Sequence, residues 1–424
     1  MKNKILLLGF AEADITPSNP IETVGFGRED QMSRGVLHPL SAQAAVWQLG
    51  EERCCVVAVD HIGFSKQHAN SLRDEIGTVL CISREKVMLC FSHCHSAPNE
   101  SASPEYYRLV CDRIKSAAAH ALQNMVPVSA AWGNACTDIG LNRRKGCDAL
   151  DRRIGILKIC GSADGKLKLL LLRVTAHNNV LKADNYLISP DYFGTVRDKL
   201  SEEFGCPVMV TQGAAGNVAP RYFQSAINPP DADDERFIRS DTALYDMASA
   251  VLSDVKPVVQ SLLPETIDRL SMYSRSITLT AEVPSYPRAL EIAAEARQSC
   301  GIDGTGWLNQ VQRLLQTGVR QETDEVEVQY FSLGDCCLCG VANEVMVEFA
   351  LRVSDLLRDD FFYFGGYTNG CTGYFPTEEE FDKGGYEVYW SMLIYYVYHG
   401  RVFPLRRDSA SELIRFVAEN APNH

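Results

Sequence analysis

The sequence predicts an α/β fold in which large mixed β-sheets are flanked by helices. Apolar runs of strand length alternate with amphipathic helical patterns through most of the chain. Several of these runs are apolar throughout, which is typical of strands covered on both faces. Two helical segments open with Ser-Pro, which suits an N-cap followed by a first helical residue. Such alternation is the pattern of an α/β protein.

In the first half of the chain, eight segments are predicted strands and three are predicted helices. The strands are expected at residues 5–15, 42–49, 54–60, 86–93, 128–135, 153–160, 168–177 and 207–216. The helices are expected at residues 65–80, 103–125 and 189–205.

Beyond residue 270 the pattern becomes less regular. Residues 275–284 and 361–367 are predicted strands, and residues 325–341 a strand or a hairpin. Helices are predicted at residues 289–298, 306–319 and 343–358, followed by a Gly-rich and Tyr-rich loop at residues 365–390. Loops of this kind at strand ends often carry functional residues.

Composition excludes several classes of protein. With 424 residues, 46% hydrophobic and without a linker-like segment, the chain is expected to form one domain spanning residues 1–424. The net charge of −13 argues against a nucleic-acid partner. No apolar stretch reaches the roughly 20 residues of a transmembrane span, and no signal peptide is evident, so a cytoplasmic location is expected. The 15 cysteines are interpreted as reduced, and those of DCCLCG, at positions 336, 337 and 339, as core residues.

Polar residues end four of the predicted strands. His93 and His95 would share one face of an extended chain and Cys94 the other, which disfavours a Cys94/His95 catalytic pair. His177 follows a buried strand, where a core histidine is the simpler interpretation. Glu344 lies at a strand-to-helix junction, where it could merely complement the helix dipole.

Taken together, these residues suggest a more specific site. Imidazoles and a carboxylate form the ligand set of a catalytic zinc ion. A fourth strand end, at Gly213 and Gly216, would let the backbone approach a ligand closely, although a plain turn explains it nearly as well.

The order of the motifs resembles the catalytic domain of the neutral/alkaline ceramidases, zinc-dependent amidases that release a fatty acid from sphingosine. This resemblance implies layered αββα sheets and helices. It covers nearly the whole chain, through AEADITPSNP, VVAVDHIG, SHCHSAP, GLNRRKG, TAHNNVLKADNYLISPDYFG, QGAAGNVAPR, ANEVMVEFALRV and GYTNGCTGYFPTEEEFDKGGYE.

The resemblance also implies a role for each matching residue. His93, His177, Glu344 and Tyr374 would be the ligands of one catalytic Zn²⁺. As catalytic residues, His95 would serve proton transfer, and Arg143 and Tyr374 would face the oxyanion of the substrate.

Other polar residues near these motifs are expected to play smaller parts. Asp60 and His61 could orient a ligand histidine, although a helix cap is the commoner role of such an Asp. Asp191 is expected in the first turn of a helix, from which it could support His177.

Two departures from the family pattern bear on mechanism. Ala219 stands where the family has a serine, and Asn217 where it has an aspartate. Water activated by zinc remains possible, whereas a serine acyl-enzyme does not. The immunoglobulin-like C-terminal domain of the family is not expected in this sequence.

The sequence thus predicts a zinc-dependent hydrolase that cleaves an amide (N-acyl) or related bond in a small or amphiphilic substrate. The alternative is a relative that binds metal or ligand but has lost or altered its catalysis, which Ala219 favours.

Overall fold

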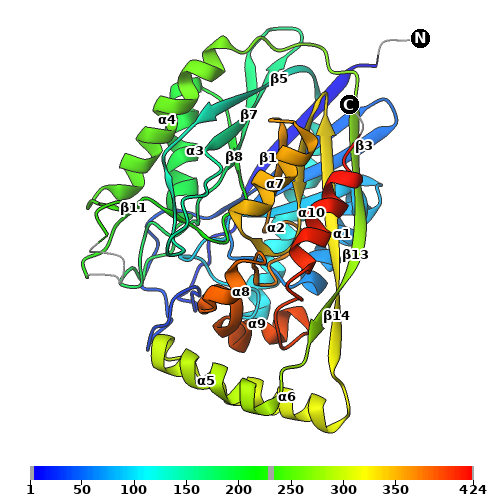
Figure 1. Cartoon of the computed structure of the whole chain (residues 1–424). Coiled ribbons are helices and arrows are strands. Elements are labelled where there is room, and N and C mark those ends of the chain that lie inside the picture. The colour runs from blue at the N-terminus through cyan, green and yellow to red at the C-terminus, as the bar shows by residue number, and fades with distance from the viewer. Residues whose placement is uncertain (1–3, 228–233, 423–424) are drawn as a thin grey trace.

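The computed structural model describes residues 4–227 and 234–422, and its largest element is an eight-stranded mixed sheet (Figure 1). The strand order is β4-β3-β2-β1-β5-β7-β8-β9, and all eight strands predicted in the first half of the chain lie in it. Their bounds are β1 (Leu6–Asp14), β2 (Ser41–Leu49), β3 (Glu52–Val59), β4 (Val87–Phe91), β5 (Val126–Cys136), β7 (Arg153–Gly161), β8 (Leu167–Val174) and β9 (Val208–Gln212).

Four helices cover the outer face of this sheet. A core cluster joins α1 (Lys66–Leu80) and α2 (Pro104–Gln123) to β1–β4, and a second joins α3 (Asp191–Phe204) and α4 (Ala243–Ser261) to β7–β9. As predicted, α2 begins after a serine cap, since Ser103 accepts a hydrogen bond from the Tyr106 N–H. Helix α1 begins after a serine cap that was not predicted, Ser65, which accepts from the His68 N–H. The parallel strands β3 and β4 are connected through α1, and the parallel strands β8 and β9 through α3.

A four-stranded sheet packs against the inner face of the first. Its order is β13 (Leu270–Glu282), β14 (Gln321–Leu333), β15 (Cys336–Gly340) and β17 (Phe362–Gly365). Buried side chains of both sheets form one cluster, in which the rings of Trp47 and Phe331 lie 5.8 Å apart. Helices α7 (Val347–Leu357) and α10 (Ser409–Glu419) cover the far side. The layered αββα fold predicted from the sequence is therefore confirmed.

The strands β13 and β14 continue past the sheet as a long hairpin (Figure 1). Its far end carries α5 (Tyr286–Cys300) and α6 (Thr305–Gln316), which share a core cluster with α9 (Met392–His399). The short helix α8 (Glu380–Lys383) and a π-helical turn (Tyr386–Trp390) precede α9. A 3₁₀ turn (Arg84–Lys86) leads into β4.

Three sequence predictions need correction. The helix α3 begins at Asp191, whose φ of +55° is left-handed, so Ser189-Pro190 is not its N-cap and first residue. The predicted helix at residues 343–358 begins only at Val347, because Glu344–Val345 form the strand β16. The loop at residues 365–390 contains the strand β18 (Tyr374–Phe375) and the helical segments already named. The helices α4, α9 and α10 were not predicted.

Short strand pairs and one loop bring distant strand ends together. β6 (Gly140–Asn142) pairs with β10 (Val218–Pro220), and β16 pairs in parallel with β18. β11 (Tyr222–Phe223) pairs with β12 (Ile238–Arg239). After β17, Tyr367 O accepts from Phe91 N–H at the end of β4, at 2.9 Å, and Gly366 N–H donates to Gly213 O after β9, at 3.2 Å. This loop therefore gathers the ends of β4 and β9 at one place.

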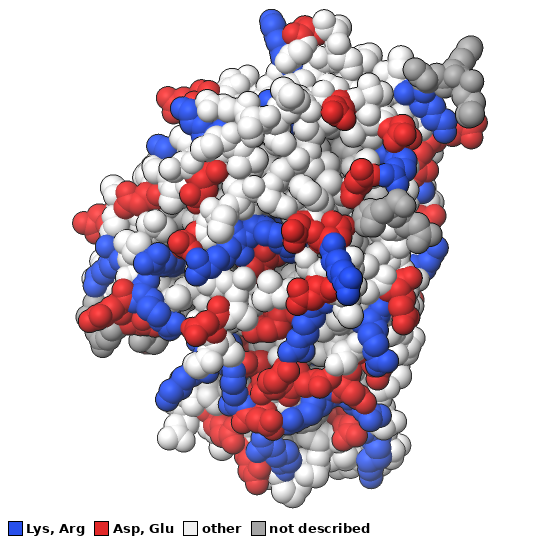
Figure 2. Space-filling model, turned by 45° about the horizontal axis from the view of Figure 1, so that its top comes forward, with Lys and Arg blue, Asp and Glu red and all other residues white. Residues whose placement is uncertain are grey.

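The surface carries charges of both signs. On the face in Figure 2, basic and acidic side chains are intermixed. Among the residues that the structure describes, no helix is both long enough and apolar enough to cross a bilayer.

Candidate metal centre and active site

His93 and His95 follow the end of β4 and are held by backbone carbonyls. His93 Nδ1 lies 2.9 Å from Ile62 O, and His95 Nδ1 lies 3.1 Å from Gly25 O. Their ring centroids are 5.0 Å apart. The φ of His93 is +54°, so the chain is not extended here, and the strand alternation expected from the sequence is not what brings the rings together.

Cys94 points away from this pair, as the sequence predicts. Its Sγ is fully buried and donates to Ser189 O at 2.9 Å. The interpretation of Cys94 and His95 as a catalytic pair, which the sequence disfavours, is therefore wrong.

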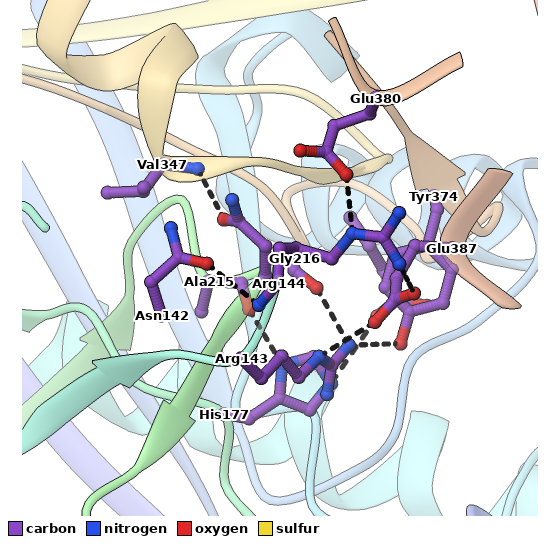
Figure 3. Close-up of polar contacts among 12 residues, drawn as sticks. Asn142, Arg143, Arg144, His177, Ala215, Gly216, Val347, Tyr374, Glu380 and Glu387 are labelled. Atoms are coloured by element: carbon purple, nitrogen blue, oxygen red, sulfur yellow. Dashed lines mark hydrogen bonds and ion pairs between the residues drawn. The ribbon is translucent and has the colours of Figure 1, made fainter. Parts of the chain in front are cut away.

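His177 comes from the end of β8, on the other half of the large sheet. Its backbone N–H donates to Val218 O at 2.8 Å, and its Nδ1 lies 2.7 Å from Ala215 O (Figure 3). The loop between β9 and β10 thus fixes both the backbone and the ring of this residue.

One ring nitrogen from each of His93, His95 and His177 falls in a cluster in which all such atoms lie within 4.8 Å of one another. Because a carbonyl oxygen only accepts hydrogen bonds, each Nδ1 must carry the proton, which leaves each Nε2 with a free lone pair. Among the described residues, Nε2 of His95 and of His177 has no hydrogen-bond partner. Three convergent, buried imidazole lone pairs are a donor set that suits a metal ion.

The electrostatics keep the rings of His95 and His177 neutral. Burial lowers the pKa of His95 well below its ordinary value, and the charges of His93 and Arg143 lower it further. Burial, followed by Arg143 and His93, has the same effect on the pKa of His177. A neutral imidazole is the form that binds metal.

Glu344 brings a carboxylate to the same place. Its Oε2 lies 3.1 Å from His93 Nε2 and 3.5 Å from His177 Nε2, and it accepts from the Tyr367 hydroxyl at 3.4 Å. Burial raises the pKa of Glu344, but His93 and Arg143 outweigh burial and hold it below the ordinary value. The alternative that Glu344 only complements a helix dipole is wrong, since the first-turn carboxylate of α7 is Glu348.

Tyr374 and Arg143 lie beside this carboxylate. The β16/β18 register pairs Glu344 with Tyr374, and Arg143 Nη2 donates to the Tyr374 hydroxyl at 2.9 Å and to Gly216 O at 2.8 Å (Figure 3). Burial raises the pKa of the Tyr374 phenol well above its ordinary value, so the phenol stays protonated. The hydrogen-bond partner of the Tyr374 hydroxyl in this structure is therefore Arg143.

Glu387 links Arg143 to its neighbour Arg144. Its Oε1 lies 3.0 Å from Arg143 Nε, and its Oε2 accepts from Arg144 Nη1 at 2.6 Å (Figure 3). Arg144 also pairs with Glu380 of α8. Burial disfavours the charge of Arg143, but Tyr374 and Glu387 outweigh burial and raise the pKa of Arg143. The guanidinium is therefore fixed and charged.

Sequence reasoning missed three residues that contact the centre. Cys371 Sγ lies 3.7 Å from His93 Nδ1 and 4.0 Å from Glu344 Oε1, and forms a second potential metal-binding group with those two residues. The other two are Tyr367 and Glu387. Their position in the Gly-rich loop at residues 365–390 was the available signal, because no periodicity marks individual residues there.

Asp60 differs from expectation, whereas Asp191 lies in the first turn of α3 as expected. Asp60 accepts hydrogen bonds from both terminal guanidinium nitrogens of Arg197, at 2.7 and 2.6 Å. It therefore does not orient His93, whose ring is held by the Ile62 carbonyl. Asp191 accepts from the backbone N–H groups of Val180 and Leu181, both at 2.9 Å, and so ties down the chain just after His177.

Asn217 and Ala219 occupy the positions at which the sequence departs from the resembled family. The Asn217 Oδ1 accepts from the Val347 N–H at 2.8 Å (Figure 3), and its Nδ2 donates to Glu348 at 2.9 Å, so this side chain caps α7. Ala219 pairs with Leu141 in the β10/β6 ribbon. It brings no hydroxyl group to this region.

A cavity of about 580 Å³ opens over the centre. His93, His95, Cys371, Arg143 and Tyr374 all line it. The remaining wall combines a few polar side chains with apolar and aromatic ones, which come from the segments after β1 and β3, from the hairpin end and from the π-helical turn and α9. This mixture is typical of a small-molecule site.

Comparisons with known proteins agree with this architecture. No protein-family model and no curated protein sequence matches the chain. A solved neutral ceramidase from Pseudomonas aeruginosa superposes with a TM-score of 0.73 at 17% identity, covering 100% of this chain and 76% of that chain. A ceramidase complexed with C2 gives 0.73 at 16%, covering 98% and 74%. The chain therefore has the fold of the neutral ceramidases.

Proposed function

We propose that this protein is a zinc-dependent hydrolase that cleaves an amide (N-acyl) or related bond in a small amphiphilic substrate. The observation that carries the proposal is the convergence of His177 and Glu344 on His93, which lines a cavity together with Arg143 and Tyr374. The fold shared with neutral ceramidases supports a hydrolase.

The donor set fits zinc. Two neutral imidazoles and an ionised carboxylate are ligands of catalytic zinc sites, with a further position left for water. We assign His93, His177 and Glu344 as ligands, with Tyr374 as the nearby fourth group expected from the sequence. When bound, zinc supplies a Lewis acid and lowers the pKa of water.

Arg143 and Tyr374 would stabilise the negative charge that grows on the acyl oxygen. Gly216 O and Glu387 fix the guanidinium, so little reorganisation is needed when that charge appears. The Tyr374 hydroxyl accepts from Arg143 and stays protonated, so its own proton is free to be donated toward the cavity.

His95 would move the proton. Hydrolysis joins a water oxygen to the acyl carbon and breaks the C–N bond, so one water proton must reach the leaving nitrogen. His95 Nε2 is unprotonated, since its Nδ1 donates to Gly25 O, and it lines the cavity. It can therefore take the proton from water and pass it on.

A second candidate function is binding of metal or ligand without turnover. Ala219 brings no hydroxyl group, and Asn217 is engaged in capping α7. The zinc-water route needs neither group, and we therefore favour the hydrolase.

The test is hydrolysis of a panel of N-acyl compounds by the full chain before chelation, after chelation and after addition of zinc. We expect turnover that chelation abolishes and zinc restores. Turnover that survives complete metal removal would exclude the proposed mechanism, and metal binding without turnover of any N-acyl compound would favour the second candidate.

A further inference from the structure

The cavity over the metal centre is lined by one carboxylate, and it does not belong to the proposed ligand Glu344. Among the described residues that line it, the only side chains of the Asp, Glu, Lys and Arg types are Glu100 and Arg143. Glu387 and Tyr374 hold Arg143. No other side chain of these four types in this lining is thus available to form an ion pair with Glu100.

Glu100 is built into the wall. Its side chain is 6% exposed, and its Oε2 accepts from the Ser65 N–H at 2.9 Å and lies 3.0 Å from His68 Nδ1. Within the described part of the chain, His68 is its only ion-pair partner. A carboxylate in such a place gains from a cation, because burial without one is costly.

Other acceptors share this cavity. Gln31 Nε2 donates to Phe26 O at 3.0 Å and to Arg28 O at 3.3 Å, which fixes Gln31 Oε1 as an acceptor. Within the described residues, neither Gln31 Oε1 nor Asn179 Oδ1 has a hydrogen-bond partner, and Asn179 is 8% exposed. An ammonium group, with three N–H donors and no acceptor, complements such a wall.

Glu100 lines the same cavity as His93 and Cys371. Cys371 Sγ in turn lies 4.0 Å from Glu344 Oε1. Apolar side chains such as Ile302 and Ile394 form another part of the wall, where an acyl or alkyl chain can pack.

We infer that Glu100 is a cation subsite for an N-acyl substrate that carries a second, protonated amine, which in chemical class is a monoacylated diamine. This inference rests on the proposed hydrolase function. It assigns the ammonium to Glu100 and the acyl chain to the apolar wall, with Gln31 and Asn179 as further acceptors in the same cavity.

The experiment compares two substrates of equal length with the full, zinc-loaded chain. One is N-dodecanoyl-1,4-diaminobutane, and the other is N-dodecanoyl-pentylamine, in which a methyl group replaces the ammonium. We expect kcat/KM to favour the diamine by about tenfold or more, as a charge-assisted hydrogen bond implies. Glu100→Gln should abolish this preference while keeping an acceptor for the Ser65 N–H.

The matched control is Glu105→Gln, which removes a carboxylate whose side chain is 77% exposed and should leave the preference intact. Equal kcat/KM for the two substrates, or an unchanged preference in a folded Glu100→Gln variant, would overturn the subsite. If neither compound is hydrolysed, calorimetric binding of both to the same chains separates the claims. If the diamine compound binds more tightly than the pentylamine compound and Glu100→Gln removes the difference, the subsite stands and the hydrolase proposal fails. If the two compounds bind equally, both proposals fail.

Discussion

At the scale of single residues, the three histidines of the candidate site share one hydrogen-bonding arrangement. Each Nδ1 is bound to a backbone carbonyl, from Ile62, Gly25 or Ala215, so each Nε2 is left for a ligand. The family resemblance of the ordered motifs, rather than their spacing, predicted which histidines meet. The sequence could not predict how, because the positive φ of His93 and the carbonyl partners are set by loops without periodicity.

Arg143 carries the most direct residue-scale prediction for catalysis. Arg143→Ala should lower kcat by about 10² to 10³ and leave KM nearly unchanged, because a fixed donor to a developing oxyanion acts mainly in the transition state. Steady-state kinetics on an N-acyl substrate measures this. Arg152→Ala, at a side chain that is 56% exposed, is the control and should behave as wild type. A variant whose only defect is a raised KM would assign Arg143 to ground-state binding.

At the scale of elements, long apolar segments were predictable and short ones were not. The strands of the large sheet were found from continuous apolar runs, which carry their own signal. β16 was missed because a two-residue strand has no period, and Glu344 was consequently expected in a helix. Such short pairs nevertheless determine where Glu344, Tyr374 and Arg143 lie.

The cap of α7 gives a stability prediction at this scale. Asn217→Ala should lower the free energy of unfolding by about 1–2 kcal/mol, because the Val347 N–H loses its acceptor at the helix N-terminus. Glu348→Ala removes the acceptor of the Asn217 Nδ2 bond, keeps the bond from the Val347 N–H to Asn217 and should cost less. Urea unfolding of the three proteins measures both changes. Equal losses in the two variants would mean that the Asn217 Nδ2 bond to Glu348, and not the cap, is what matters.

Asp191, the first residue of α3, gives a pH prediction. Burial raises its pKa to about 6 from 3.8, although backbone N–H groups oppose this. The folded state binds the proton of the Asp191 carboxyl group more tightly than the unfolded state does. The contribution of Asp191 to stability therefore falls as pH rises from about 4 to about 6, by up to roughly 3 kcal/mol.

Asp191→Asn should remove that dependence. The free energy of unfolding of wild type minus that of Asp191→Asn should therefore decrease between pH 4 and about 6 and stay level above. Denaturant unfolding at several pH values provides the measurement. If this difference in the free energy of unfolding increases with pH instead, the backbone N–H groups lower the pKa of Asp191 by more than burial raises it.

At the scale of the whole molecule, the fold brings together strand ends that are far apart in the sequence. His93 follows β4 and His177 follows β8, near opposite ends of the strand order. Glu344 lies in β16, which comes between β15 and β17 of the second sheet in the chain. The loop after β17 bonds to both β4 and the segment after β9. Periodicity predicted an α/β protein, but the layering and the meeting of these residues rested on the ordered motifs, since no local pattern encodes them.

The central claim is that this assembly holds one zinc ion. Its most direct test is the metal content of the purified full chain by mass spectrometry, beside a His93→Ala/His177→Ala variant and a His68→Ala/His120→Ala control that changes two histidines outside the assigned ligand set. The account predicts close to one zinc per chain in the wild type and the control, and none in the His93/His177 variant. Absence of zinc from the wild type after growth with zinc, or its full retention in that variant, would contradict it.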